Sequence, residues 1–261
     1  MNIVVCLKQV PGTTDVRIDP ETNTLRRQGI KNIVNPFDTY ALEEGVRLKE
    51  RYGGKVTAIS MGPPQAEEIL REAISCGADE AILLSDAAFA GADTLATSYT
   101  LSQAMRKIEQ YDLVICGRQT IDGDTGQVGP ELAEWLDVPF AAYVSKVEEI
   151  NGDLMKVERM VEDGHEIVEM PLPGIITVTK EINVPRLPSL RGMARSRKAE
   201  IPVWTAGDLG VDEGMVGLSG SATTVVRVFF PERIHEGEML EGDPESQVDA
   251  LLEKLREARI A

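Results

Sequence analysis

The stretch "DLVICGRQTIDGDTGQVGPELAEWL", residues 112–136, joins three kinds of sequence in a row. It opens with the apolar run "DLVICG", continues through a polar loop with Asp122 and Asp124 among glycines, and ends in "QVGPELAEWL", which has helical periodicity. A buried strand that passes through a loop into an amphipathic helix is the repeating unit of α/β folds. The stretch therefore predicts a parallel sheet covered by helices, with this loop at the carboxyl end of a strand.

The first half of the chain repeats the same alternation of strand and helix. Further strands are predicted at "NIVVCL", "KVTAISM" and "EAILLS", with amphipathic helices between them. The first helix is expected to have Asp38 as its N-cap, to bury Leu42, Val46 and Leu48, and to stop at Gly53. The next two are expected to start at Pro64 and Asp93 and to end at Gly77 and Tyr111. The predicted fold is a mostly parallel sheet with helices on both faces.

Beyond residue 137 the pattern changes to strands joined by turns. "AAYVSKVEEI", "LMKVERMVED", "EIVEMPLPG" and "IITVTK" follow one another with no helix between them. They are predicted to be antiparallel strands that extend the same sheet. From Asn183 the chain is rich in Pro, Gly and basic residues, and it ends in a helix predicted from Pro244 to about Arg259. We expect two parts: a nucleotide-binding domain over residues 1–182, and a loop with a C-terminal arm over 183–261 that packs on another surface.

The composition argues against several classes of function. The 261 residues include 27 basic and 43 acidic side chains, a formal charge of −16 that disfavours nucleic acid as a partner. No apolar run approaches the ~20 residues that span a bilayer, and the N-terminus lacks a signal-peptide pattern. Cys6, Cys76 and Cys116 lie in apolar stretches without metal-type spacing, so they are expected to be buried, reduced thiols. A cytoplasmic protein without membrane insertion is the resulting expectation.

Metal binding and acid–base catalysis fit the loop at residues 121–130 poorly. An EF-hand loop that starts at Asp122 needs Gly at its sixth position and Glu at its twelfth, but Gln127 and Ala133 stand there. The chain has only two histidines, His165 and His235, which gives little support to a zinc site or a catalytic triad. No metal site and no catalytic side chain are predicted.

Phosphate binding fits the loop better, since backbone N–H groups and the helix dipole converge at a helix N-terminus. Gly123, Gly126 and Gly129 permit close approach of a ligand, and Thr125 offers a hydroxyl group. Asp122 and Asp124 are expected to bond loop N–H groups or a ribose hydroxyl group. An ordinary turn before a helix remains the alternative. Neither a P-loop motif nor G-x-G-x-x-G is present, so the expectation is a non-standard adenine-nucleotide site in a crevice at the sheet edge.

Several motifs together resemble one family over essentially the whole chain. They are "KQVPGTTDVRID", "NPFDTYALEEGVRLKE", "SMGPPQAEEILREAISCGAD", "GRQTIDGDTGQVGPELAEWL", "VERMVEDGHEIVEMPLPGIITV" and "NVPRLPSLRGMARSRKAEI". The sequence resembles the beta subunit of electron-transferring flavoproteins, and the segment from Val157 to Pro173 looks like the family signature. The resemblance implies a Rossmann-like domain of the adenine nucleotide alpha hydrolase-like type, and a heterodimer with an alpha subunit that carries FAD.

The resemblance also implies a second nucleotide in this subunit. In conventional members it is structural AMP, and in the NADH-linked bifurcating type it is a second FAD. The uninterrupted "DGDTGQVGP" looks like the bifurcating type, although that type usually has Ala where this chain has Gly126. The nucleotide site implied by resemblance consists of Cys6, Asn35, Pro36, Phe37, Asp38, Met61, Asp122, Gly123, Asp124, Thr125, Gly126, Gln127 and Val128.

The implied chemistry is hydride transfer from NADH to the flavin of this subunit, followed by separation of the two electrons. One electron passes through the alpha-subunit FAD to an acyl-CoA dehydrogenase, and the other passes to ferredoxin or flavodoxin. The flavin carries the reaction, so redox activity is expected only in the heterodimer. Two alternatives remain: a conventional subunit that binds AMP, and a nucleotide-binding hydrolase or ATP binder of the same fold.

The segment "PRLPSLRGMARSRK" is basic within an acidic chain. A solvated loop that offsets acidic neighbours is one reading of it. By resemblance it is instead the loop that docks on the dehydrogenase, with Leu190 as its apolar anchor and Arg191 and Arg195 beside it. An apolar anchor surrounded by charge suits a transient, electrostatically steered contact. Two surfaces are open to the apolar stripe of the C-terminal helix, the alpha subunit and this subunit's own sheet, and the resemblance favours the alpha subunit.

Overall fold

The computed structural model describes residues 1–12, 17–18, 25–26, 32–226 and 237–260. The chain forms two compact units, Met1–Val226 and Arg227–Ala261. Part of the loop after the first strand, residues 13–16, and His235 lie outside the described residues.

A nine-stranded sheet forms the centre of the first unit, in the order β11-β10-β9-β12-β8-β1-β6-β7-β13. Its middle strands are parallel and pair β12 with β8, β8 with β1, β1 with β6, and β6 with β7. Their bounds are Asn2–Cys6 for β1, Lys55–Met61 for β6, Glu80–Leu84 for β7, Leu113–Gly117 for β8 and Gly174–Val178 for β12. The predicted α/β class and the strands at its centre are confirmed.

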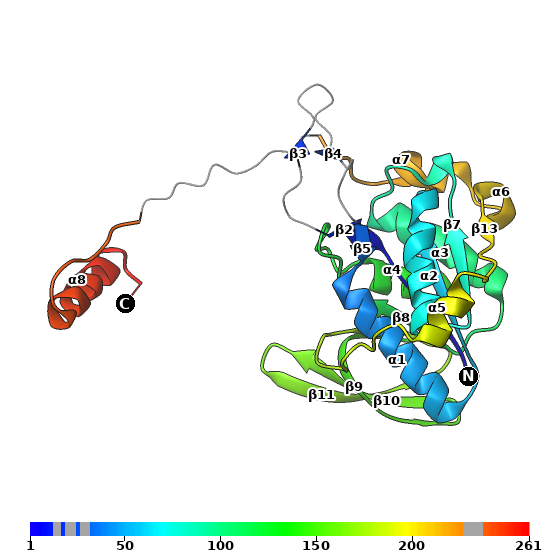
Figure 1. Ribbon diagram of the computed structural model, residues 1–261, viewed down its shortest axis with the longest axis horizontal. Helices are drawn as coiled ribbons and strands as arrows, with labels where there is room; N and C mark the ends of the chain where they lie inside the picture. The colour runs from blue at the N-terminus through cyan, green and yellow to red at the C-terminus, as the bar shows by residue number, and fades with distance from the viewer. Residues whose placement is uncertain (13–16, 19–24, 27–31, 227–236, 261) are drawn as a thin grey trace. The chain divides into compact units, whose positions relative to one another are not determined.

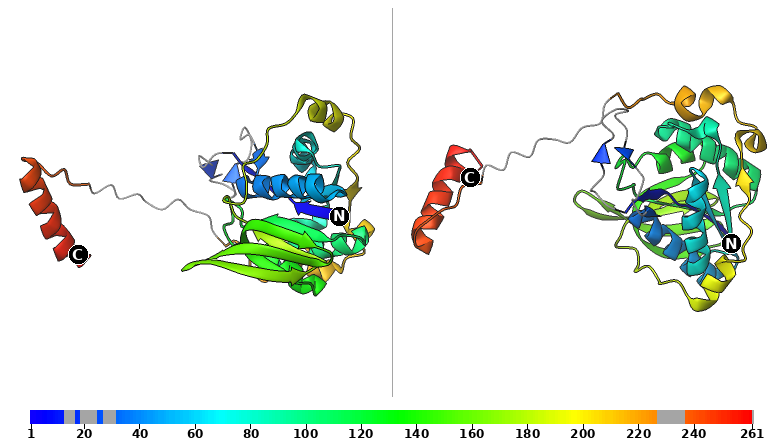
Figure 2. Two further views of the ribbon diagram at one scale, coloured as in Figure 1. Left: turned by 90° about the horizontal axis from the view of Figure 1, so that it is seen from below. Right: turned by 45° about the horizontal axis from the view of Figure 1, so that its top comes forward.

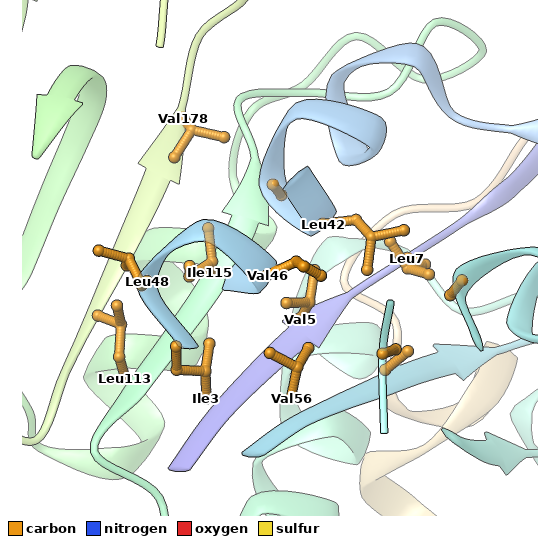
Figure 3. Packing of buried hydrophobic residues seen from close by; sticks show 14 of the residues in the cluster. Ile3, Val5, Leu7, Leu42, Val46, Leu48, Val56, Leu113, Ile115 and Val178 are labelled. Carbon is orange, nitrogen blue, oxygen red and sulfur yellow. The ribbon is translucent and has the colours of Figure 1, made fainter. Parts of the chain in front are cut away.

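Helices cover both faces of this sheet, as predicted (Figures 1 and 2). One buried cluster joins the sheet to α1 (Pro36–Tyr52) and α2 (Glu67–Cys76), and the other joins it to α3 (Thr94–Ile108) and α4 (Val128–Leu136). Figure 3 shows the first cluster, in which Leu42, Val46 and Leu48 of α1 pack against β1, β8 and their neighbours. Burial of this stripe, at about 25 cal/mol per Å² of apolar surface, holds α1 to the sheet.

Three helix ends differ from the prediction. The second helix, α2, begins at Glu67 after a 3-10 turn over Pro64–Ala66, and not at Pro64. The first helix begins at Pro36 with Asn35 as its N-cap, so Asp38 lies inside the first turn and is not the N-cap. Proline is pre-organised for the first helical position, which explains the earlier start. The helix α3 has its predicted N-cap, Asp93, but stops before Glu109, which has a φ of 63°, and not at Tyr111.

The antiparallel extension is present but has three strands where four were predicted. β9 (Phe140–Asn151), β10 (Leu154–Val161) and β11 (Gly164–Pro171) form an antiparallel meander, which is the lower part of Figure 1. The prediction for the fourth strand is wrong, because β12 pairs in parallel with both β8 and β9. All five residues of β12 are buried, the pattern of a parallel strand covered on both faces.

The compact unit does not end at residue 182, where the domain boundary was predicted. Residues beyond it form α5 (Leu190–Ser196), β13 (Val203–Trp204), α6 (Ala206–Leu209) and α7 (Gly217–Gly220). β13 adds to the sheet beside β7, and α5 packs on α2. The proline-rich segment has few apolar residues for a core of its own, and these contacts hold it against the sheet and α2. The segment up to Val226 therefore belongs to the first unit.

Shorter elements complete the described chain. Two-stranded pairs join β2 (Gln9–Pro11) to β5 (Asn32–Val34) and β3 (Arg17–Ile18) to β4 (Leu25–Arg26). Short 3-10 helices occupy Pro64–Ala66, Ala87–Phe89 and Glu213–Met215.

The second unit contains the predicted C-terminal helix, α8 (Pro244–Glu257), which begins at the N-cap Asp243. Its apolar stripe is exposed at Val248, Leu251 and Leu252. The packing of this arm on an alpha subunit stays a prediction. Among the described residues, no helix combines the length and the apolar character that a bilayer crossing requires.

Candidate functional site

The predicted nucleotide-site residues come together at one edge of the sheet. Cys6 ends β1, Met61 ends β6, and residues 122–128 follow the end of β8. Parallel strands point the same way, so these ends share an edge, and the start of α1 meets it through contacts described below. We call this region, made of the ends of β1, β6, β8 and β12 with the starts of α1 and α4, the carboxyl edge.

Asn35 and Asp38 tie three segments of the carboxyl edge together. Asn35 is fully buried, and its Nδ2 donates to Asp38 Oδ1 at 2.9 Å and to the carbonyl of Gln119 at 2.9 Å. Its Oδ1 accepts from the N–H of Ile121 at 3.1 Å, while Asp38 Oδ2 accepts from the N–H of Lys8 at 2.7 Å. In these bonds the side-chain amide of Asn35 acts as a donor through Nδ2 and as an acceptor through Oδ1. Its side chain therefore positions the loops after β1 and β8.

Gly117 allows α1 to start directly on the end of β8. A Cβ atom at this position would lie 2.7 Å from the carbonyl carbon of Phe37 and 2.9 Å from the backbone nitrogen of Asp38. Backbone atoms cannot move aside as a flexible side chain can. Glycine at the last residue of β8 is thus a condition for the contact between Asp38 and the sheet.

Two titratable groups beneath the carboxyl edge, Asp38 and Cys116, have raised pKa values. Burial raises the pKa of Asp38 to about 7, although its hydrogen bonds from Asn35 and Lys8 act in the opposite direction. A hydrogen bond with Cys6, together with burial, raises the pKa of the Cys116 thiol well above its usual range. The three cysteines are free, as expected, but only Cys116 is fully buried, and Cys6 and Cys76 are half-buried. A neutral thiol at Cys116 is a poor nucleophile.

The two loop aspartates are engaged by side chains of the protein. Asp122 Oδ1 lies 2.8 Å from Lys8 Nζ, and Asp124 accepts a hydrogen bond from the side-chain amide of Gln119. Burial alone would raise the pKa of Asp122, but the hydrogen bond and charge of Lys8 leave it lowered. Asp122 and Asp124 thus bond the side chains of Lys8 and Gln119, and a bond to a ribose hydroxyl group stays a prediction. Both aspartates stabilise the loop conformation.

The loop reaches α4 through two residues in the left-handed region, Asp124 with a φ of 53° and Gly126 with a φ of 66°. Gln127 is the N-cap of α4, and its side chain makes no capping bond. Among the described residues, the N–H groups of Val128 and Gly129 have no acceptor. Gly129 packs tightly on Thr177 of β12, which fixes the helix start against the sheet. Free N–H groups at a fixed helix start suit an anionic ligand group.

The described residues do not contain a cluster of three His, Cys, Asp or Glu side chains that is suited to a metal ion. The carboxyl edge also contains three residues absent from the predicted set: Lys8, Arg118 and Gln119. Lys8 and Gln119 hold the loop through the bonds above. The sequence could have indicated these three residues only by their position, because each lies within three residues of the end of a buried strand.

The predicted docking residues lie on α5, away from these bonds. The side chain of Leu190 is 88% exposed, and Arg191 is also exposed. Arg195 has a structural partner, because its Nη2 donates to the carbonyls of Ile74, at 2.9 Å, and Ala78 at the end of α2. Arg195 thus fixes α5 on α2, its side chain is still 46% exposed, and docking through Leu190, Arg191 and Arg195 stays a prediction.

Comparison with known proteins identifies the family. The model of the electron transfer flavoprotein domain matches residues 22–209. The chain is 54% identical, over 100% of both sequences, to the electron transfer flavoprotein subunit beta of Thermoanaerobacterium thermosaccharolyticum. It is 46% identical to protein FixA of Azotobacter vinelandii, over 98% of this chain and 94% of that one.

A third relative is the caffeyl-CoA reductase-Etf complex subunit CarD of Acetobacterium woodii, 45% identical over 100% of both sequences. The family model covers well over half of the chain, and these relatives align over nearly their full lengths. The fold agrees, with a mostly parallel sheet between two layers of helices. The chain therefore belongs to the electron transfer flavoprotein family, as a beta subunit with a role in electron transfer.

Proposed function

We propose that the carboxyl edge of this beta subunit binds FAD, that the FAD accepts a hydride from NADH, and that its two electrons leave on separate routes. The observation that carries the proposal is the start of α4, where the N–H groups of Val128 and Gly129 lack acceptors behind a loop held in an unusual conformation. A phosphate group would supply the missing acceptor and favourable charge at the helix N-terminus.

The side chains at this edge fit a nucleotide better than a catalytic centre. The thiol of Cys116 favours its neutral form, Asp38 is buried and hydrogen-bonded to Asn35, and Asp122 is paired with Lys8. None of these groups is arranged as a nucleophile with an adjacent base. In the proposal the residues of the chain have three tasks. Asn35 and Asp38 set the loop positions, Lys8 and Gln119 fix the two aspartates away from the ligand, and the loop and α4 amides bind phosphate.

A bound FAD would supply the redox chemistry, which no side chain here provides. The loop "DGDTGQVGP" favours FAD over AMP by its resemblance to bifurcating members. The names of two relatives are consistent with this choice. CarD is a subunit of a caffeyl-CoA reductase-Etf complex, and FixA has a name that differs from that of the electron transfer flavoprotein subunits. AMP in the same place, with a structural role only, is the alternative, and it would use the same helix N-terminus.

The proposed partners follow the same reasoning. We propose a heterodimer with an electron transfer flavoprotein alpha subunit, an acyl-CoA dehydrogenase as one electron acceptor, and ferredoxin or flavodoxin as the other. The exposed Leu190 beside Arg191 suits transient docking on an acidic, partly apolar partner surface. Free thiols at all three cysteines suit a reducing compartment such as the cytoplasm.

The nucleotide content of the purified heterodimer tests the proposal. Acid extraction followed by chromatography counts FAD and AMP per complex. Two FAD and no AMP are expected. One FAD with one AMP would contradict the bifurcating assignment and leave the conventional one, and a single FAD without AMP would contradict nucleotide binding by this subunit.

A further inference from the structure

Arg118, at the carboxyl edge, has no charged partner among the residues that the structure describes. Its backbone N–H donates to the carbonyl of Val178 at 3.0 Å, which fixes it between the ends of β8 and β12. Within the described part of the chain, its side chain makes no ion pair, and its buried Nε has no hydrogen-bond partner. Several other arginines of this acidic chain form ion pairs, as Arg47 does with Glu43 and Arg71 with Glu67. A buried donor without a partner is costly, so an external acceptor is the natural explanation.

The guanidinium group of Arg118 is held in place by an aromatic ring. Its Cζ lies 5.1 Å from the ring centroid of Tyr143 in β9. Tyr143 has a φ of 57°, which a side chain of this size rarely adopts, and its N–H donates to Thr177 Oγ1 at 3.1 Å. Strained residues of this kind persist where surrounding contacts enforce them, often at binding sites. Stacking orients the guanidinium without using any of its N–H donors.

Arg118 and the start of α4 face the same part of the sheet. Side chains alternate along β8, so Arg118 lies on the face of Cys116, which packs in the same cluster as Leu132 of α4. The carbonyl of Arg118 lies 3.4 Å from the position of a Cβ atom built on Gly126, in the last turn of the loop before α4. Thr177, which accepts from Tyr143, also packs on Gly129 of α4. Thus Arg118 and Tyr143 both adjoin segments that contact the loop before α4 or the start of α4 itself.

We propose that Arg118, supported by Tyr143, binds the second phosphate of a diphosphate-linked adenine nucleotide, and so makes the site selective for ADP and FAD over AMP. The inference rests on the proposed nucleotide site. The amides of α4 bind one phosphate, which AMP also has. The guanidinium forms charged hydrogen bonds with the next phosphate, which only the diphosphate carries.

The test is calorimetric titration of AMP and ADP into the full-length heterodimer after bound nucleotide has been removed. The unaltered protein is expected to bind ADP roughly tenfold more tightly than AMP, the ratio that one charged hydrogen bond supplies. In Arg118→Gln this preference disappears and the AMP affinity stays the same. Tyr143→Leu keeps the charge but removes the stacking, so it reduces the preference in part. Arg51→Gln, an exposed arginine over the ring of Tyr52 at the C-terminal end of α1, is the matched control and leaves both affinities unchanged.

The outcomes separate the two proposals. If Arg118→Gln retains the ADP preference, or weakens AMP and ADP equally, the role of Arg118 is refuted while the nucleotide site stands. If the unaltered protein binds ADP no better than AMP, the selectivity is refuted as well. If it binds neither nucleotide, the proposed function fails, and the inference that rests on it fails too. Circular dichroism and thermal unfolding of each variant confirm that the fold is retained.

Discussion

Arg186 joins the segment after residue 182 to α1, and its replacement by methionine should destabilise the first unit. Its Nε lies 2.7 Å from Glu43 Oε2, and its Nη1 lies 2.6 Å from Glu50 Oε1. The side chain of Glu43 is only 4% exposed, whereas that of Glu50 is 54% exposed. The pair with Glu43 therefore dominates, because exposed pairs contribute little.

The expected loss in the free energy of unfolding depends on the contacts that Glu43 keeps after the substitution. Loss of one partner from a fully buried ion pair costs about 3–5 kcal/mol, because the other charge stays buried. Glu43 would retain Arg47, whose Nε lies 2.7 Å away, and Arg186 is itself 32% exposed. We therefore halve the value, to about 2 kcal/mol at neutral pH. For a domain of this size, that loss lowers Tm by about 4–8 °C.

The pH dependence follows from the pKa of Glu43. Burial would raise it, but the hydrogen bonds from Arg186 leave it below the ordinary 4.5. A carboxyl group whose folded pKa is lowered stabilises the fold above its unfolded pKa, and this contribution is lost as pH falls through the folded value. The effect of Arg186→Met is therefore complete at neutral pH.

Thermal unfolding of the full chain, followed by circular dichroism at neutral pH, measures the change. Arg191→Met is the matched control, because Arg191 is exposed and forms no ion pair among the described residues. Its Tm should stay close to that of the unaltered protein, as for most surface substitutions. If the Tm of Arg186→Met matched that of Arg191→Met, the reasoning that Arg186 compensates a buried charge would be refuted.

Three further substitutions test other parts of the structure. Gly117→Ala places a Cβ atom 2.7 Å from the carbonyl carbon of Phe37, so it should lower Tm and weaken ADP binding in the same calorimetric titration; unchanged values for both would contradict the close contact. Asp38→Asn removes a carboxyl group whose folded pKa, about 7, lies above the ordinary 3.8. The folded state of the native protein binds this proton more tightly than the unfolded state does, so the free energy of unfolding falls as pH rises from 3.8 to about 7. The difference in Tm, variant minus native, should therefore increase between about pH 5 and about pH 8. A pH-independent difference would refute this. Leu132→Ala removes a fully buried side chain of α4 and should cost about 2–5 kcal/mol in urea unfolding, whereas Leu251→Ala, 48% exposed on α8, should cost far less.

The parallel core was predictable because burial and periodicity agree there. The strand Lys55–Met61 is a β-branched run between two helical patterns, and its bounds match the prediction. The strand Gly174–Val178 was misassigned because short turns precede it, although its mostly apolar sequence, GIITV, is typical of a parallel strand. Its neighbours are set by how the meander folds back, which local sequence does not specify.

The domain boundary and parts of the site depend on contacts between distant residues. The proline-rich sequence after residue 182 is typical of a linker, but the bonds of Arg186 and Arg195 fix it to α1 and α2. The nucleotide-site residues were predicted from their resemblance to a family, several of them follow strand ends, and their role in nucleotide binding stays a prediction. The role of Lys8 was not predictable, because its partner, Asp122, is 114 positions away in the sequence.

Nucleotide content of the heterodimer carrying Gly126→Val tests the location of the site most directly. Gly126 has a φ of 66° in the loop before α4, and a β-branched residue strongly disfavours that conformation. Gly152→Val is the matched control, since Gly152 has a φ of 59° in the turn between β9 and β10, with nothing within 4 Å of the added Cβ atom. Acid extraction of Gly126→Val should show the loss of one of the two nucleotides per complex, while Gly152→Val retains both. Full nucleotide content in Gly126→Val would contradict a nucleotide site at the carboxyl edge.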